Sequence, residues 1–165
     1  MAMKQAKRIL IMGLPGSGKT YFAQRLKAYL ESYYGAVNEL SLLPASDAKI
    51  TVSWINADEV RRYYNDWDFS TEGRIRQSRR MRELSEEANT DYCIVDFVAP
   101  LVEMRNNFKA DWTIWMDTIR EGRYEDTNKM FVEPELYDFR ITEQDADKWS
   151  EFIAEHIVDN RRRPT

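Results

Sequence analysis

The sequence predicts one α/β domain, with a central parallel sheet, helices on both faces and ligands at the carboxyl ends of the strands. Short apolar runs alternate along the chain with segments whose apolar residues repeat at helical spacing. A glycine-rich loop lies between the first such run and the first helical segment. The chain of 165 residues is 43% apolar, which suffices for one core, so we predict a single domain over residues 1–165.

The alternation places the elements in order. Strands are expected at residues 8–12, 51–55, 92–97, 112–116 and 137–141. Helices are expected at residues 21–34, 59–64, 73–89 and 101–108, and from Thr142 onward, where threonine is a favoured N-cap. Residues 35–53 form an extended connection, and the charged segment 118–134 has the length and polarity of a lid.

The glycine-rich loop fits the pattern G-x-x-x-x-G-K-[ST]. Its residues are Gly13, Leu14, Pro15, Gly16, Ser17, Gly18, Lys19 and Thr20. A strand before this pattern and a helix after it are the context that a phosphate-binding loop requires. The sequence therefore predicts the three-layer P-loop NTPase fold and a bound nucleoside triphosphate.

Each position of the loop has a chemical role. The glycines let backbone N–H groups turn toward the phosphates, and Lys19 supplies a cation near the β- and γ-phosphate oxygens. Thr20 offers a hydroxyl to Mg²⁺. ATP as co-substrate and Mg²⁺ as cofactor follow from this prediction.

Two aspartates are candidates for the chemistry. Asp58 follows the second strand, where its carboxylate could orient an acceptor hydroxyl or bind Mg²⁺, and Asp96 ends the third strand in a position suited to the metal. Alternatively, each is a helix cap or a loop acid. A GTPase is disfavoured because residues 128–131 do not match N-K-x-D, so a small kinase fits better.

Arginines are dense between residues 61 and 82. Arginine binds phosphate or sulfate through paired hydrogen bonds, so some of them should contact the acceptor, while others form a solvated face. On a helix, Arg76, Arg79 and Arg80 share one face. In the lid, Arg123 is a candidate ATP ligand, although an ordinary surface loop is the alternative.

Composition excludes several other classes. The net charge of −4 does not suggest generic nucleic-acid binding. Cys93 lies in an apolar run and is expected to be a buried hydrophobic residue. We find no leader sequence and no run of about 18 apolar residues, so a cytoplasmic protein without a membrane span is expected.

From about Arg8 to Pro134 the chain resembles the adenylylsulfate (APS) kinases, which phosphorylate the 3′-hydroxyl of adenosine 5′-phosphosulfate to give PAPS. Residues 56–61 resemble the D-G-D-x-V-R segment of that family, residues 68–70 its G-F-S, residues 97–100 its F-I-S-P and residues 116–118 its V-D-T. The resemblance implies that Asp58 orients the hydroxyl. It also implies an acceptor site formed by Arg61, Phe69, Arg74, Gln77, Phe97 and Val98.

Other functions stay open. The lid has Glu125 and Asp126 where the APS kinases have lysines, which favours a kinase of the same fold acting on another hydroxyl, such as that of a nucleotide, a modified base or a metabolite. A protein that binds ATP without phosphoryl transfer is a further alternative. A homodimer is expected only from the resemblance.

Overall fold

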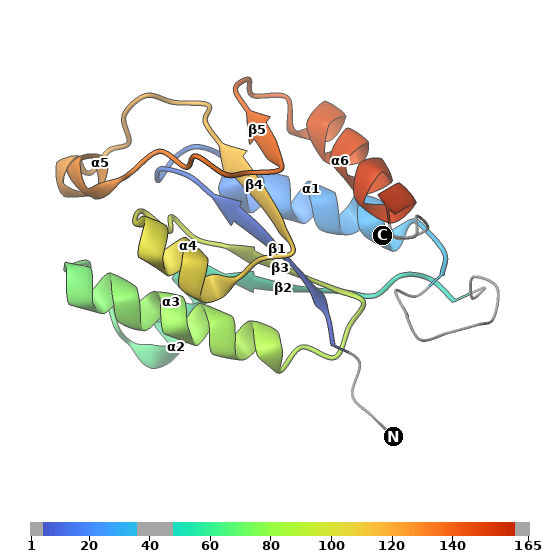
Figure 1. Cartoon of the computed structure of the whole chain (residues 1–165), viewed down its shortest axis with the longest axis horizontal. Helices are drawn as coiled ribbons and strands as arrows, with labels where there is room; N and C mark the ends of the chain where they lie inside the picture. The colour runs from blue at the N-terminus through green and yellow to red at the C-terminus, as the bar shows by residue number, and fades with distance from the viewer. Residues whose placement is uncertain (1–4, 36–47, 161–165) are drawn as a thin grey trace.

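A computed structural model describes residues 5–35 and 48–160. The strands are β1 (Lys7–Met12), β2 (Val52–Asn56), β3 (Tyr92–Asp96), β4 (Trp112–Met116) and β5 (Phe139–Ile141). They pair in parallel in the order β2-β3-β1-β4-β5, so their carboxyl ends share one edge of the sheet. The helices are α1 (Lys19–Glu31), α2 (Ala57–Tyr64), α3 (Thr71–Glu86), α4 (Val102–Phe108), α5 (Glu125–Met130) and α6 (Ala146–Asn160). The predicted fold class is confirmed (Figure 1).

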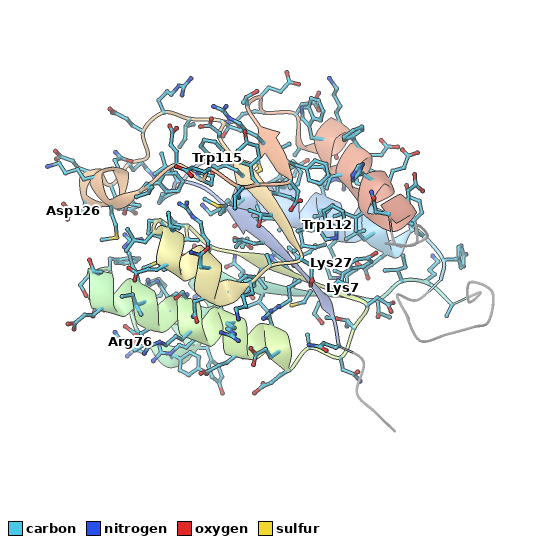
Figure 2. All side chains as sticks on the ribbon, viewed as in Figure 1. Lys7, Lys27, Arg76, Trp112, Trp115 and Asp126 are labelled. Atoms are coloured by element: carbon cyan, nitrogen blue, oxygen red, sulfur yellow. The ribbon has the colours of Figure 1, made fainter. Side chains whose placement is uncertain are left out.

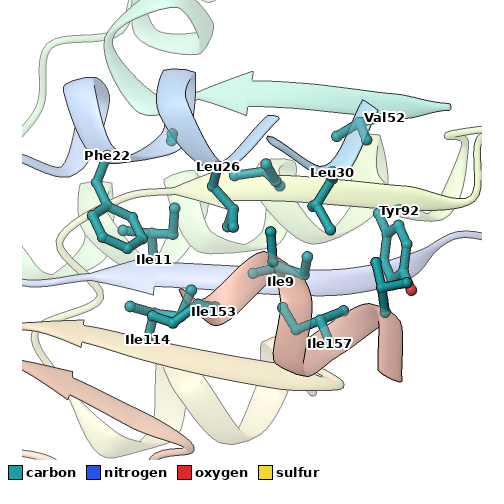
Figure 3. Close-up of a cluster of buried hydrophobic side chains, with 14 of the residues drawn as sticks. Ile9, Ile11, Phe22, Leu26, Leu30, Val52, Tyr92, Ile114, Ile153 and Ile157 are labelled. Carbon is teal, nitrogen blue, oxygen red and sulfur yellow. The ribbon is translucent and has the colours of Figure 1, made fainter. Parts of the chain in front are cut away.

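Helices α1 and α6 cover one face of the sheet (Figure 3). Ile9 and Ile11 face this layer from β1, because alternate residues of a strand point to the same side. They meet an apolar layer formed by Phe22, Leu26, Leu30, Ile153 and Ile157. All of these side chains are buried.

The opposite face is covered by α2, α3 and α4. Leu10 and Met12 point to this side of β1, in a second cluster with Val60, Met81 and Phe108. Strand β1 lies between β3 and β4, so it is buried on both faces, which explains its uninterrupted apolar run. The first helix and the phosphate-binding motif are therefore attached to a strand in the middle of the sheet.

Two predicted boundaries were wrong at the C-terminal end. Helix α6 begins at Ala146 and not at Thr142, because Asp145 provides the cap: its Oδ1 accepts from Lys148 N at 3.3 Å. Strand β5 begins at Phe139 and not at residue 137. The Tyr137 side chain is exposed and its ring packs 5.7 Å from that of Trp115.

The predicted lid, residues 118–134, is not entirely a loop, because it contains helix α5. Of the predicted connection 35–53, residues 36–47 lie outside the described residues. No helix in the described part of the chain is long and apolar enough to cross a membrane.

The reactivity of the Cys93 thiol gives a test of how β3 is packed. Cys93 is fully buried, and burial raises its pKa from 9.0 to about 12. We expect no reaction of the native protein with a thiol reagent at pH 8 and stoichiometric reaction once it is unfolded in guanidinium. Between pH 9.0 and about 12 the thiol ionises in the unfolded chain but not in the folded one, so its contribution to the free energy of unfolding falls as pH rises. Rapid labelling of the native thiol would contradict this packing.

Candidate functional site

The glycine-rich loop connects β1 to α1 with the geometry that its motif requires. Gly18 is the N-cap of α1 with φ of 95°, a left-handed conformation, and no side chain caps the helix. The first backbone N–H groups of α1 are therefore available to an anion. At Gly13, a Cβ atom would lie 2.5 Å from the Met116 carbonyl oxygen, so a side chain there would force the loop away from β4.

Lys19 lies at the base of this loop. Its Nζ donates to the Leu14 carbonyl oxygen at 3.0 Å. Burial lowers the pKa of Lys19 to about 8, while the negative charges of Asp96 and Asp58 act in the opposite direction. Both predicted acids thus lie close enough to Lys19 to affect its charge.

Asp96 is the centre of a buried polar network. Trp54 Nε1 donates to Asp96 Oδ2 at 2.7 Å, and Asn56 Nδ2 lies 3.2 Å from both carboxylate oxygens. The same Asn56 Nδ2 is 3.2 Å from Thr20 Oγ1. The register of β2 against β3 pairs Asn56 with Asp96, and Trp54 lies on the same face two residues earlier. Burial raises the pKa of Asp96, and these hydrogen bonds oppose that rise.

These residues suit a magnesium ion. Mg²⁺ is usually held by one or two carboxylates together with phosphate oxygens and water, not by an all-protein cage. Thr20, Asp58 and Asp96 supply a hydroxyl and two carboxylates beside the loop, and a buried carboxylate such as Asp96 is stabilised by a cation. Among the described residues, no group of three or more His, Cys, Asp or Glu could hold a metal alone.

A cavity of about 1260 Å³ opens at the carboxyl edge of the sheet, on the side where α5 lies (Figure 1). Pockets for single small ligands are usually roughly 300–1,000 Å³, so this cavity has room for more than one. Of the predicted residues, its wall includes Pro15, Gly16, Gly18, Lys19, Thr20, Asp58, Arg61, Phe69, Arg74, Gln77, Asp96, Phe97, Val98 and Arg123. Gly13, Leu14 and Ser17 are buried and are not part of this wall, and Leu14 lines a second, smaller cavity of about 150 Å³.

Arg61 supports the aromatic part of this wall. Its guanidinium is buried, and Nη1 donates to the carbonyl oxygens of Asp66 at 3.0 Å and Asp68 at 3.2 Å. Its Cζ lies 4.3 Å from the centre of the Phe69 ring. Burial, and then the charge of Arg74, lower the pKa of Arg61. Arg61 therefore fixes the loop that carries Phe69.

Arg74 joins that loop to the lid. Its Nε donates to the Phe69 carbonyl oxygen at 3.0 Å, and its Nη2 donates to Thr127 Oγ1 at 2.6 Å. Thr127 lies on α5 and is buried. Burial lowers the pKa of Arg74, whereas the charge of Asp126 raises it. The loop that carries Phe69 and the segment 118–134 are thus connected through Arg74.

Two other arginines of α3, Arg76 and Arg80, form ion pairs with carboxylates of the same loop. Arg76 and Arg80 both bind Asp66, at 2.6 and 2.7 Å, and Arg76 also reaches Asp68 at 3.2 Å. Hydrogen bonding to Arg76 holds the pKa of Asp66 well below its usual range. Figure 2 shows Arg76 on α3 and Asp126 on α5, in separate parts of the molecule. Arg76 and Arg80 are therefore occupied by the protein itself.

The segment predicted as a lid, residues 118–134, is attached at both ends. Thr118 Oγ1 donates to the Ser17 carbonyl oxygen at 2.7 Å. At the other end, Arg105 donates to the carbonyl oxygens of Ala99, at 2.8 Å, and of Val132. Within the lid, Gly122 and Asn128 exchange hydrogen bonds of 2.8 and 3.0 Å. Arg123 lines the cavity and is exposed.

The sequence analysis missed Trp54 and Thr127. Trp54 could have been found, because the two-residue period of β2 places it on the same face of the strand as Asn56. Nothing in the sequence pointed to Thr127, because its contact depends on how the lid folds over α3.

Part of the sequence matches a known protein family. Residues 8–99 match the family described as "Chromatin associated protein KTI12". The chain belongs to this family. The matched segment contains the glycine-rich loop, Asp58, the arginines of α3 and Asp96, but not the lid. No curated protein sequence matches the chain.

Several solved kinases share the fold. One is the Mycobacterium tuberculosis APS kinase in complex with AMPPNP and APS, with a TM-score of 0.65 and 18% identity over 94% of this chain and 97% of that one. Another is the Acinetobacter baumannii shikimate kinase in complex with shikimate, with a TM-score of 0.59 and 14% identity over 97% of each chain. A third is a Sinorhizobium meliloti gluconokinase, with a TM-score of 0.57 and 12% identity over 95% of this chain and 96% of that one. At these identities the likeness shows the fold alone. The chain therefore has a kinase-like P-loop fold, and the kinases that share this fold are named for different substrates.

The bond between Arg74 and Thr127 gives a prediction for the lid. Thr127→Val keeps the shape of the side chain and removes the hydroxyl, which leaves a buried guanidinium N–H without its partner. We expect faster amide hydrogen exchange in α5 and a loss of about 1–3 kcal/mol in the free energy of unfolding. Thr71→Val, at an exposed position of α3, is the matched control. Unchanged exchange in α5 would show that this bond does not hold the lid.

Proposed function

We propose that the protein is an ATP-dependent phosphotransferase that moves the γ-phosphoryl group of Mg-ATP to a hydroxyl of a small acceptor. One observation carries the proposal: Lys19, Thr20, Asp58 and Asp96 line the same cavity as Arg61, Phe69 and Arg74. A site that only binds ATP needs the first group. The second group gives a transfer reaction a place for its acceptor.

The chemistry follows from these positions. The bond between the γ-phosphorus and the β,γ-bridging oxygen breaks, the acceptor oxygen bonds to the phosphorus, and the hydroxyl proton leaves to a base. Asp58, exposed at the start of α2, orients this hydroxyl and accepts its proton. Lys19 neutralises charge on the transferred group.

The metal and the lid complete the arrangement. Thr20 and Asp96, with Asp58 nearby, would hold Mg²⁺, which when bound neutralises phosphate charge. Residues 118–134 cover the cavity and exclude water, with Arg123 close to the phosphates.

Adenosine 5′-phosphosulfate is the first acceptor to test, because the fold is shared with an APS kinase and because Phe69 offers an aromatic surface. Asp126 in the cavity wall adds negative charge near Arg74, which favours a less anionic acceptor as the second choice. ATP binding without transfer is a third function. The description of the matched family as chromatin associated, rather than as a kinase, favours it.

The catalytic prediction concerns Asp58. We expect Asp58→Asn to lower ADP release from Mg-ATP with acceptor by roughly 10²–10⁴-fold, because the amide cannot accept the proton, with ATP affinity retained. The assay uses APS and a panel of nucleosides and nucleotides. Asp159→Asn, at the exposed end of α6, is the control. Unchanged ADP release in Asp58→Asn would remove Asp58 from the reaction, and no turnover with any acceptor would favour the third function.

The binding prediction concerns Lys19. Lys19→Met keeps the length of the side chain and removes the cation, so we expect ATP affinity to fall roughly ten- to hundredfold in a calorimetric titration. Lys27→Met is the matched control, since Lys27 lies on α1 in an ion pair with Glu31 at 2.7 Å (Figure 2). Equal ATP affinity in both variants would mean that the loop does not bind the phosphates as proposed.

A further inference from the structure

Asn56, the last residue of β2, has a side-chain amide that is held in one orientation. It is the N-cap of α2, where its Oδ1 accepts a hydrogen bond from Glu59 N at 3.1 Å. The flipped amide would set its NH₂ group against that N–H and its oxygen against the Asp96 carboxylate, so the observed orientation is strongly preferred. The donor end of the amide, Nδ2, therefore faces Asp96 and Thr20.

Nδ2 contacts both of the groups to which the proposed function assigns Mg²⁺. It lies 3.2 Å from Thr20 Oγ1 and 3.2 Å from each carboxylate oxygen of Asp96. An oxygen accepts a hydrogen bond through a lone pair, and it binds a metal ion through a lone pair as well. All three side chains line the cavity, and Asn56 is only 9% exposed. The amide is thus a neutral competitor for the oxygens of the metal site.

The strength of these contacts determines which form of the metal can displace the amide. Mg²⁺ gives up its water reluctantly and is usually bound through one or two carboxylates together with substrate phosphates. In the protein alone, the ion would deprive the buried amide of its acceptors and gain no phosphate ligand. With ATP, phosphate oxygens are added. The amide bonds of 3.2 Å are also longer than the usual length of about 2.9–3.0 Å, so they cost less to break.

We propose that Asn56 is a positioning residue that makes metal binding depend on the nucleotide. Its amide binds Thr20 and Asp96 in the protein alone, so that free Mg²⁺ gains no site there and the metal enters together with ATP. This inference rests on the proposed function for the location of the metal. It adds how the site is loaded: with the Mg-ATP complex, and not with the metal first.

The test measures the binding of Mn²⁺ to the whole chain without nucleotide. Mn²⁺ takes the same oxygen ligands as Mg²⁺, and its free concentration is read by electron paramagnetic resonance. We expect wild type to bind no Mn²⁺ at concentrations up to about 1 mM.

Asn56→Asp converts the competitor into a ligand. One oxygen of the new carboxylate can still cap α2, while the other replaces the NH₂ group that faces Thr20 and Asp96. Facing carboxylates repel each other unless a cation lies between them. We therefore expect this variant to bind free Mn²⁺ at least roughly tenfold more tightly than wild type, and its thermal midpoint to rise with added Mn²⁺.

The matched control is Asn106→Asp, the same change at an exposed position of α4 outside the cavity wall, and it should behave as wild type does. Tight binding of free Mn²⁺ by wild type overturns the inference, and so does an Asn56→Asp variant that gains no affinity. A residue that only caps α2 predicts the second result, because aspartate caps a helix as well as asparagine.

A second variant covers poor folding of the first. Asn56→Ser keeps a capping oxygen and removes the amide donors, so it should also bind free Mn²⁺ more tightly than wild type, and equal binding would overturn the inference. ADP release is measured separately. Tight Mn²⁺ binding confined to the Asn56 variants, without turnover by wild type, would keep this inference and remove the phosphotransferase proposal. Turnover by a wild type that binds free Mn²⁺ tightly would do the reverse.

Discussion

A buried carboxylate at the end of a central strand constrains much of this site. Asp96 has 2% of its surface exposed, and an ionised group in that position needs hydrogen bonds and a cation. Trp54 and Asn56 supply the hydrogen bonds from β2, and Lys19 supplies positive charge from α1. These contacts require β1, β2 and β3 in their observed register. The sheet order and the phosphate-binding loop are therefore linked through one acidic side chain.

Around Phe69, arginines build the cavity wall. Arg61 and Arg74 donate to backbone carbonyl groups of residues 66–69, and Arg76 binds the Asp66 carboxylate from outside. A loop fixed by so many charged hydrogen bonds presents Phe69 in one place, which lowers the entropic cost of binding a ring against it. Loop placement thus explains Arg74, Arg76 and Arg80 of α3, whereas Arg82 bonds Glu86 and Asn107 instead.

Features that depend on a local pattern of residues could be predicted from the sequence. The strand, glycine-rich loop and helix at residues 7–31 follow from apolar spacing and from a motif whose glycines have few structural alternatives. Boundaries were less predictable where side chains compete for one role: Thr142 and Asp145 are both good N-caps, and only the path of the chain after β5 selects Asp145. Thr127 could not be assigned, because its partner is 53 residues away and depends on the docking of α5.

The groups that line the cavity differ in electrostatic character, and this difference bears on the choice of acceptor in the proposed reaction. At the loop end, exposed backbone N–H groups and Lys19 favour phosphate. In another part of the cavity wall, Arg61 Nη1 and Arg74 Nη2 donate to groups of the protein, and Asp126 adds a negative charge near Arg74. A highly charged acceptor would meet the Asp126 carboxylate there as well as the remaining donors of Arg61 and Arg74. If the proposed transfer reaction takes place, an acceptor with little negative charge, or with a flat ring that packs on the exposed Phe69, would therefore suit this wall better than a second cluster of negative charge.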